Sequence, residues 1–365
     1  MSQPIKSGGR GGSDWRGWIG HGFSLLELLV SMAVLAIIMV LMFSLVNSTS
    51  SIWRSTTGKI QTFQAARAAM DTISRNVAQA TLSPYWDYFD KNGQRTPLWD
   101  ASQPYASVNP TAQYGRYSDL QFVCGDGKTL TGRDANTHAI FFQAPLGYST
   151  NSTNQAQSLD SLLNTAGYYI EYGSDAEWLP NIEALKANQK NRYRLLEVLQ
   201  PSELVNVFTN AASVDPGYWI RDDNRLSSNR RVLAENMIAM IIHPKLSTGE
   251  NNSSLAGLGD SYTYNSREGQ LSDPKRHQLP PMLGLTMVAI DEDSAARLDR
   301  AGTLKSTVES ALNGKFETPG TDSSGFPKKM AEDLDNLKAF LDDKRIGYRI
   351  FTTDIGIRAA KWSDK

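Results

Sequence analysis

One carboxylate, Glu27, stands at the start of the most apolar stretch of this 365-residue chain. The residues that follow, Leu28 to Val46, include only two polar side chains, Ser31 and Ser44. A carboxylate at the centre of an isolated membrane span costs roughly 2.5–3.5 kcal/mol on insertion scales, and less near the interface. We therefore expect Glu27 either to have a positively charged partner or to lie where its carboxylate reaches the lipid headgroups.

The rest of the chain offers little that could form an active site or a metal site. The segment Gly125–Thr129 resembles part of a phosphate-binding loop but lacks its leading glycine, which favours a tight turn between strands. Two acidic clusters, 291–293 and 222–224, lack EF-hand spacing, so we expect solvated turns, with calcium as the alternative. The chain has no Gly-x-Ser-x-Gly elbow. A triad of residues distant in sequence stays open, but we expect no enzyme and no cofactor.

Composition limits the class of protein further. The net charge is −1, and the first 22 residues carry three basic side chains against Asp14. The remaining chain is therefore slightly acidic, which argues against a nucleic-acid partner. The single cysteine, Cys124, excludes an intrachain disulfide and is expected to be a small apolar strand residue. None of the four histidines, at 21, 138, 243 and 277, forms a pair with metal-binding spacing on a helix.

Residues 1–22 precede the apolar run and carry Lys6, Arg10 and Arg16. This positive excess places the N-terminus on the cytoplasmic side of a membrane. As a helix, the run from Leu28 to Val46 would be about 28 Å long, enough to cross the hydrocarbon core. It could be an ordinary signal anchor, a signal peptide cleaved behind the run, or a leader that is cut in front of it so that the helix is retained.

The helix is expected to continue beyond the membrane. From Trp53 onward, apolar side chains recur at intervals of three, four or seven residues, which places them on one face of a helix: Ile60, Phe63, Ala66, Met70, Ile73 and Val77. Pro84 should end the helix near Leu82, and Gly58 is a weak point within it. Two helices joined near residues 47–51 are the alternative.

We expect the remaining residues, 83–365, to form one globular domain. Residues 84–117 show no periodicity and are expected to form an ordered loop with aromatic anchors. Runs of β-branched and aromatic residues predict strands at 120–123, 139–143, 168–172, 193–199, 237–243, 283–291 and 348–357. Short helices are expected at 202–210, 294–300, 303–312 and 330–342. A long helix followed by mainly consecutive strands predicts an α+β fold, with an antiparallel sheet packed on the helix.

The residues at the start of the apolar run favour the third of these possibilities, a leader that is cut in front of the helix. The segment 22–30, GFSLLELLV, closely resembles the prepilin peptidase and methylation motif of type IV pilin-like proteins. The resemblance implies that prepilin peptidase cuts after Gly22 and that the new N-terminal residue, Phe23, is methylated. It also implies that Glu27 meets the N-terminal amine of a neighbouring subunit when the helices bundle. A cut at this point would divide the chain into a leader 1–22, a helix 23–82 and the domain 83–365.

Weaker resemblances extend over most of the chain. The order of the segments 168–172, 193–197 and 279–290 is similar to that of the larger J-type minor pseudopilins. The segments 288–292 and 340–363 resemble the pilin-like Verru_Chthon cassette protein C family. These resemblances imply a pilin-like fold and a minor subunit of a pilus or of a type II secretion-like pseudopilus, held in the inner membrane with its domain in the periplasm. The alternative is a membrane-anchored periplasmic module that binds a ligand or a partner.

Overall fold

The computed structural model describes residues 24–90, 92, 93, 95, 113–151, 161–178, 189–210, 212–221, 228–245, 261–271, 273, 275–317 and 325–360. Gly22, Phe23 and the acidic cluster 222–224 lie outside these residues. The chain divides into two compact units, residues 1–54 and 55–365. The arrangement is a long N-terminal apolar helix with antiparallel β-sheets, an α+β fold that fits the pilin-like plan predicted from the sequence.

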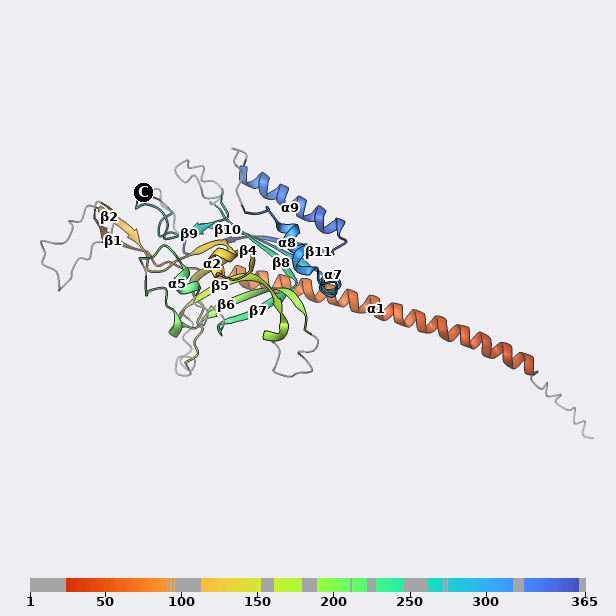
Figure 1. Ribbon diagram of the computed structural model, residues 1–365. Helices are drawn as coiled ribbons and strands as arrows, with labels where there is room; N and C mark the ends of the chain where they lie inside the picture. Colours follow the sequence, from red (N-terminus) through yellow and green to blue (C-terminus); the bar gives the residue numbers. More distant parts are fainter. Residues whose placement is uncertain are drawn as a thin grey trace, which may run out of the picture. The chain divides into compact units, whose positions relative to one another are not determined.

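Helix α1 runs from Leu25 to Val77 and belongs to both units (Figure 1). The two-helix alternative is therefore wrong, and Gly58 does not interrupt the helix. The helix ends at Val77 rather than at Leu82, because the chain then turns into the sheet region, where the Thr81 N–H donates to the Gln143 carbonyl at 2.9 Å. The predicted apolar stripe is confirmed in its second half, where these residues are buried: Ala66, Ala69, Met70, Ile73 and Val77.

The largest sheet has six antiparallel strands in the order β7-β6-β5-β4-β3-β9. The strands are β3 (Val123–Asp126), β4 (Ala135–Pro145), β5 (Leu163–Ser174), β6 (Asn191–Gln200), β7 (Arg230–Glu235) and β9 (Tyr264–Asn265). Four of the predicted strands fall in or beside this sheet, although β3 begins three residues later than expected. Cys124 is buried in β3 as predicted, and burial raises the pKa of its thiol.

A second sheet of three antiparallel strands has the order β11-β10-β8. Its strands are β8 (Met237–Lys245), β10 (Met282–Ile290) and β11 (Tyr348–Gly356). The chain passes from β7 to β8 through Asn236, whose φ of 61° lies in the left-handed region that asparagine tolerates better than most residues. The Thr137 hydroxyl on β4 donates to the Met240 carbonyl at 2.9 Å and so ties the two sheets together.

A third pair of strands, β1 (Tyr85–Phe89) and β2 (Gln113–Tyr117), lies in the segment expected to be an ordered loop. That expectation was wrong for these ten residues. In both strands the side chains alternate between exposed and buried, and Phe89 and Tyr117 are buried. The two-residue period is hard to see in the sequence, because aromatic side chains occupy both faces: Tyr85 and Trp86 are exposed, whereas Phe89 and Tyr117 are buried.

Short helices complete the domain: α2 (Gly127–Thr131), η2 (Asp175–Glu177), η3 (Ser202–Leu204), α5 (Gly217–Ile220), α7 (Glu292–Arg300), α8 (Leu304–Leu312) and α9 (Gly325–Asp343). The three C-terminal helices were predicted, and Leu337 and Leu341 of α9 are buried as expected. Segment 125–129 is not a simple turn, because Asp126 caps α2 by accepting the Thr129 N–H at 2.8 Å. At 202–210, a single 3-10 turn replaces the expected helix.

The packing of α1 predicts a strong difference between two isoleucines of the same helix. Ile73 is 1% exposed, whereas Ile60 is 50% exposed. Because a buried isoleucine leaves a cavity when it is truncated, Ile73→Ala should lower the free energy of unfolding by about 2–5 kcal/mol. Urea unfolding of the detergent-solubilised chain, followed by tryptophan fluorescence, measures this loss. Ile60→Ala is the matched control and should lose under about 1 kcal/mol; equal losses would contradict the packing described here.

Candidate functional site

The first turn of α1 holds Glu27, the carboxylate that the sequence singled out. The Glu27 N–H donates to the Ser24 hydroxyl at 3.2 Å, and the Ser24 N–H donates to the Glu27 carboxylate at 3.5 Å. This reciprocal pair is a capping box, which the Ser-x-x-Glu spacing at 24–27 signals in the sequence. The predictions from the sequence did not include it. Glu27 thus helps to start the helix, and it forms no ion pair with any residue that the structure describes.

The residues after Glu27 present apolar side chains to their surroundings all around the helix. Every residue from Leu25 to Val46 is exposed within the chain, and this stretch is long and apolar enough to cross a membrane. A helix that is apolar on all sides is normally buried, either in lipid or against other helices. None of the described residues covers this stretch, and its length and composition suit a bilayer or a bundle of other helices.

Farther along the same helix, two polar side chains contact the N-terminus of α7. Lys59 Nζ lies 3.5 Å from Asp291 Oδ2, and the Ser55 hydroxyl donates to Asp293. Asp291 is buried and caps α7 by accepting the Ser294 N–H at 2.7 Å. The acidic cluster 291–293 is therefore not the solvated turn expected from the sequence. Its carboxylates contact Ser55 and Lys59 of α1 and cap the N-terminus of α7.

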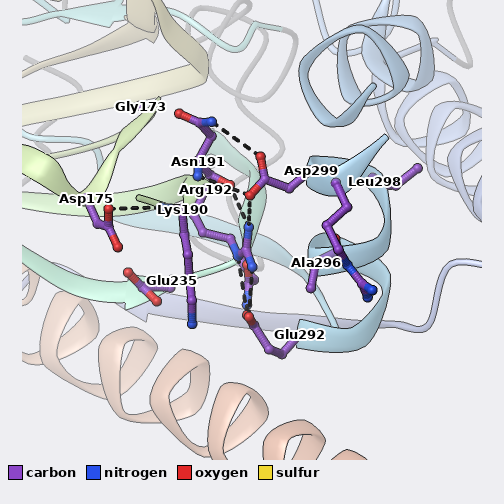
Figure 2. Close-up of polar contacts among 12 residues, drawn as sticks. Gly173, Asp175, Lys190, Asn191, Arg192, Glu235, Glu292, Ala296, Leu298 and Asp299 are labelled. Carbon is purple, nitrogen blue, oxygen red and sulfur yellow. Dashed lines mark hydrogen bonds and ion pairs between the residues drawn. The ribbon is translucent and has the colours of Figure 1, made fainter. Parts of the chain in front are cut away.

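Arg192 fixes α7 from the side of the sheet, as Figure 2 shows. Its guanidinium is 2% exposed and lies 2.8 Å from Glu292 and 2.9 Å from Asp299, at the two ends of α7. Asn236 Nδ2 donates to Glu292 at 2.7 Å. Burial raises the pKa of Glu292, but hydrogen bonds from Arg192 and Asn236 outweigh it and hold the pKa below its ordinary value. The cluster is a positioning device, since each of its charges has a partner.

A second polar cluster attaches the end of α1 to the six-stranded sheet. Asn76 Nδ2 donates to the Tyr168 hydroxyl at 2.7 Å, and this hydroxyl donates to Glu197 at 2.8 Å. Arg231 pairs with the same carboxylate. Burial and the charge of Glu197 raise the pKa of Tyr168, so its hydroxyl stays protonated and acts as a donor. These hydrogen bonds attach α1 rigidly to the sheet. None of the side chains in this cluster is activated as a nucleophile.

Among the described residues, no group of three or more His, Cys, Asp or Glu side chains is arranged to hold a metal ion. His138 is buried, accepts the Ile242 N–H at 2.9 Å and contacts the Phe316 carbonyl at 2.9 Å. Burial lowers its pKa to about 4. His138 is therefore a neutral core residue that bridges the sheets.

Comparison with known proteins supports the interpretation of the N-terminus. Residues 21–43 match the family model described as a prokaryotic N-terminal methylation motif, a stretch that contains Gly22, Phe23 and Glu27. No curated protein and no solved structure matches the chain. The motif and the apolar helix support a membrane-anchored chain with a type IV pilin-like N-terminus, and they favour a structural subunit over an enzyme.

The charges around Glu292 predict a pH-dependent contribution to stability. The pKa of Glu292 is lower in the folded chain than the roughly 4.3 of an unperturbed glutamate, so its stabilising effect is present above that pH and is lost as the pH falls through the folded value. The stabilities of the wild type and of Glu292→Gln, measured by urea unfolding, should differ most at pH 7, and the difference should shrink as the pH falls below about 4.3. Glu332→Gln, at an exposed site on α9, should match the wild type throughout. A difference between the wild type and Glu292→Gln that does not change with pH would contradict the ion pair with Arg192.

Proposed function

We propose that this protein is a minor subunit of a type IV pilus or of a type II secretion-like pseudopilus. Prepilin peptidase removes residues 1–22 and leaves Phe23 as the methylated N-terminus. The helix then holds the subunit in the inner membrane, with the domain in the periplasm, until the subunit enters the filament. The observation that carries this proposal is the methylation motif at the head of a helix that is bare over residues 25–46 and packed on a sheet over residues 66–77.

Under this proposal, the negative charge of Glu27 helps the subunits to assemble. Cleavage after Gly22 would create a charged amine on Phe23, four residues before Glu27 on the same helical face. Between adjacent subunits, the Glu27 carboxylate can pair with the amine of a neighbour, and methylation leaves the charge of that amine in place. Since Glu27 has no cationic partner in the described part of its own chain, the carboxylate is available for this contact.

The size of the domain supports a minor position rather than a repeated one. Residues 83–365 form a large domain, and packing such a domain at every position of a thin filament is harder than packing it at a few positions or at the tip. The segments similar to J-type pseudopilins and to the Verru_Chthon cassette protein C family fall on β5, β6, β10 and β11, which belong to the two larger sheets. The finer family assignment rests on these sequence resemblances.

Processing can be tested directly on the mature N-terminus. Mass spectrometry of the protein purified from membranes should find a chain that begins with methylated Phe23. Gly22→Val should leave the leader attached, because the peptidase cuts after that glycine, whereas Gly20→Val in the same leader should be processed normally. A mature chain that begins beyond Val46 would overturn the proposal, since the helix would then have been discarded.

The role of Glu27 is tested by a variant that keeps the shape of the side chain and removes its charge. Glu27→Gln should be cleaved normally but should enter filaments roughly tenfold less, or worse. Leaving one charge of a desolvated pair alone costs about 2–5 kcal/mol, and each 1.4 kcal/mol is a factor of ten. Sheared filament fractions, normalised to the membrane pool, measure incorporation. Ser31→Ala, one turn along the helix, is the control; equal incorporation of both variants would remove the proposed role of Glu27.

A further inference from the structure

A cavity of about 770 Å³ opens beside β1 and β2, in the range of pockets that hold small ligands. The described residues that line it include no aspartate or glutamate, and its arginines, its histidine and its aromatic rings are Arg95, Arg267, Arg276, His277, Phe89 and Tyr117. Such a wall carries a positive charge on a concave surface.

Arg267 is the most deeply buried cation of this wall, with 3% of its surface exposed. Its guanidinium donates to the Tyr218 hydroxyl at 2.7 Å and to the Ser213 carbonyl at 3.1 Å, and it also contacts three further backbone carbonyls. Its Nε has no partner, and no described carboxylate forms an ion pair with it. Neutral acceptors hold the side chain in place but leave its positive charge uncompensated.

Two neighbouring residues of the wall, Arg276 and His277, also have buried nitrogen atoms without a hydrogen-bond partner in the described chain. Arg276 lies over the Phe89 ring, with its guanidinium carbon 5.7 Å from the ring centroid, and its Nε also lacks a partner. His277 is 2% exposed, and neither of its ring nitrogens has a hydrogen-bond partner in the described chain. Burial and then Arg276, Arg267 and Arg116 lower the pKa of His277 to about 3. Of the three arginines in the wall, Arg95 is the one that pairs with a carboxylate in the described part of the chain, that of Asp87.

Unpaired buried donors cost about 1–3 kcal/mol each, and more when they are charged. A carboxylate or phosphate group would accept from such donors in short, charge-assisted hydrogen bonds. The rings of Phe89 and Tyr117 add flat apolar surface beside the charged groups. These features select an anion that also carries a ring or another compact apolar face.

We propose that this cavity is a binding site for a small oxyanion ligand, such as an acidic sugar or a phosphorylated compound, with Arg267, Arg276 and His277 as its donors. The ligand's anionic group lies against the two arginines, and its body lies against the aromatic rings. The site belongs to the folded domain and does not depend on cleavage after Gly22. A failure of processing and a failure of anion binding are therefore separate results.

Calorimetric titration of the full chain in detergent tests the site. The probes are glucuronate as the carboxylate, inorganic phosphate as the phosphate, and glucose as the neutral control. We expect saturable binding of at least one anion, which weakens as salt is raised, and no binding of glucose. Binding of glucuronate alone assigns a carboxylate ligand, and binding of phosphate alone assigns a phosphorylated one. The absence of saturable binding for both anions would overturn the proposal.

Variants at the edge of the cavity identify the residues responsible, since Arg267 holds several backbone carbonyls and its replacement could unfold the domain. Arg276→Gln should weaken binding of the anion about tenfold, the effect of losing about 1.4 kcal/mol, and Arg276→Lys should recover part of the loss. Lys275→Gln removes a neighbouring cation that does not line the cavity and should bind within about twofold of the wild type. Equal affinity of Arg276→Gln and the wild type, with both folded by circular dichroism, would contradict the assignment.

Discussion

The structure depends on one helix that must satisfy two environments in succession. Residues 25–46 of α1 are apolar on every side and have no cover from the described chain, whereas residues 66–77 bury one face against the sheets. Ala66, Ala69, Met70 and Ile73 are all buried on that face. Because the helix is continuous, the segment that lies in lipid or in a bundle and the segment that anchors the domain are one covalent element.

Polar contacts fix that anchor more specifically than apolar packing could. Apolar faces slide over one another at modest cost, but a buried charge requires its partner in one position. Lys59 meets Asp291 at the start of α7, Arg192 holds α7 at both ends, and Asn76 joins Tyr168 on β5. These contacts fasten residues 55–77 of the helix to the domain in one register.

The sequence predicted those parts of the fold whose signal is local. The apolar run, the stripe that ends at Val77, and the strands β5, β6, β8, β10 and β11 each have a periodic or compositional pattern of their own. The separation of the six-stranded sheet from the three-stranded sheet could not be predicted, because Asn236 turns the chain between β7 and β8 and Thr137 links β4 to β8. Both are single polar residues whose partners are distant in sequence.

The same limit applied to the candidate sites. The methylation motif around Glu27 is a contiguous pattern and was found, but the capping box at Ser24 lay within it unnoticed. The acidic cluster 291–293 was mistaken for a solvated turn because the lysine and the arginine that pair with it lie over 90 residues away. The cationic cavity had no signal at all, since its donors come from separated segments and its aromatic residues were assigned to a loop.

The buried arginines of this domain differ in whether a described carboxylate neutralises their charge. Arg192 has two carboxylates, and Arg230 has Glu171 at 2.9 Å together with Glu177, so each of these charges is neutralised where it lies. Arg267 is as deeply buried, yet its described partners are carbonyls and a hydroxyl, which orient a guanidinium without neutralising it. A fold without a disulfide has reason to retain buried ion pairs as internal fasteners. The hydrogen bonds of Arg267 to backbone carbonyls give it a structural role, but they leave its positive charge beside the cavity without a counter-charge, which an anionic ligand would supply.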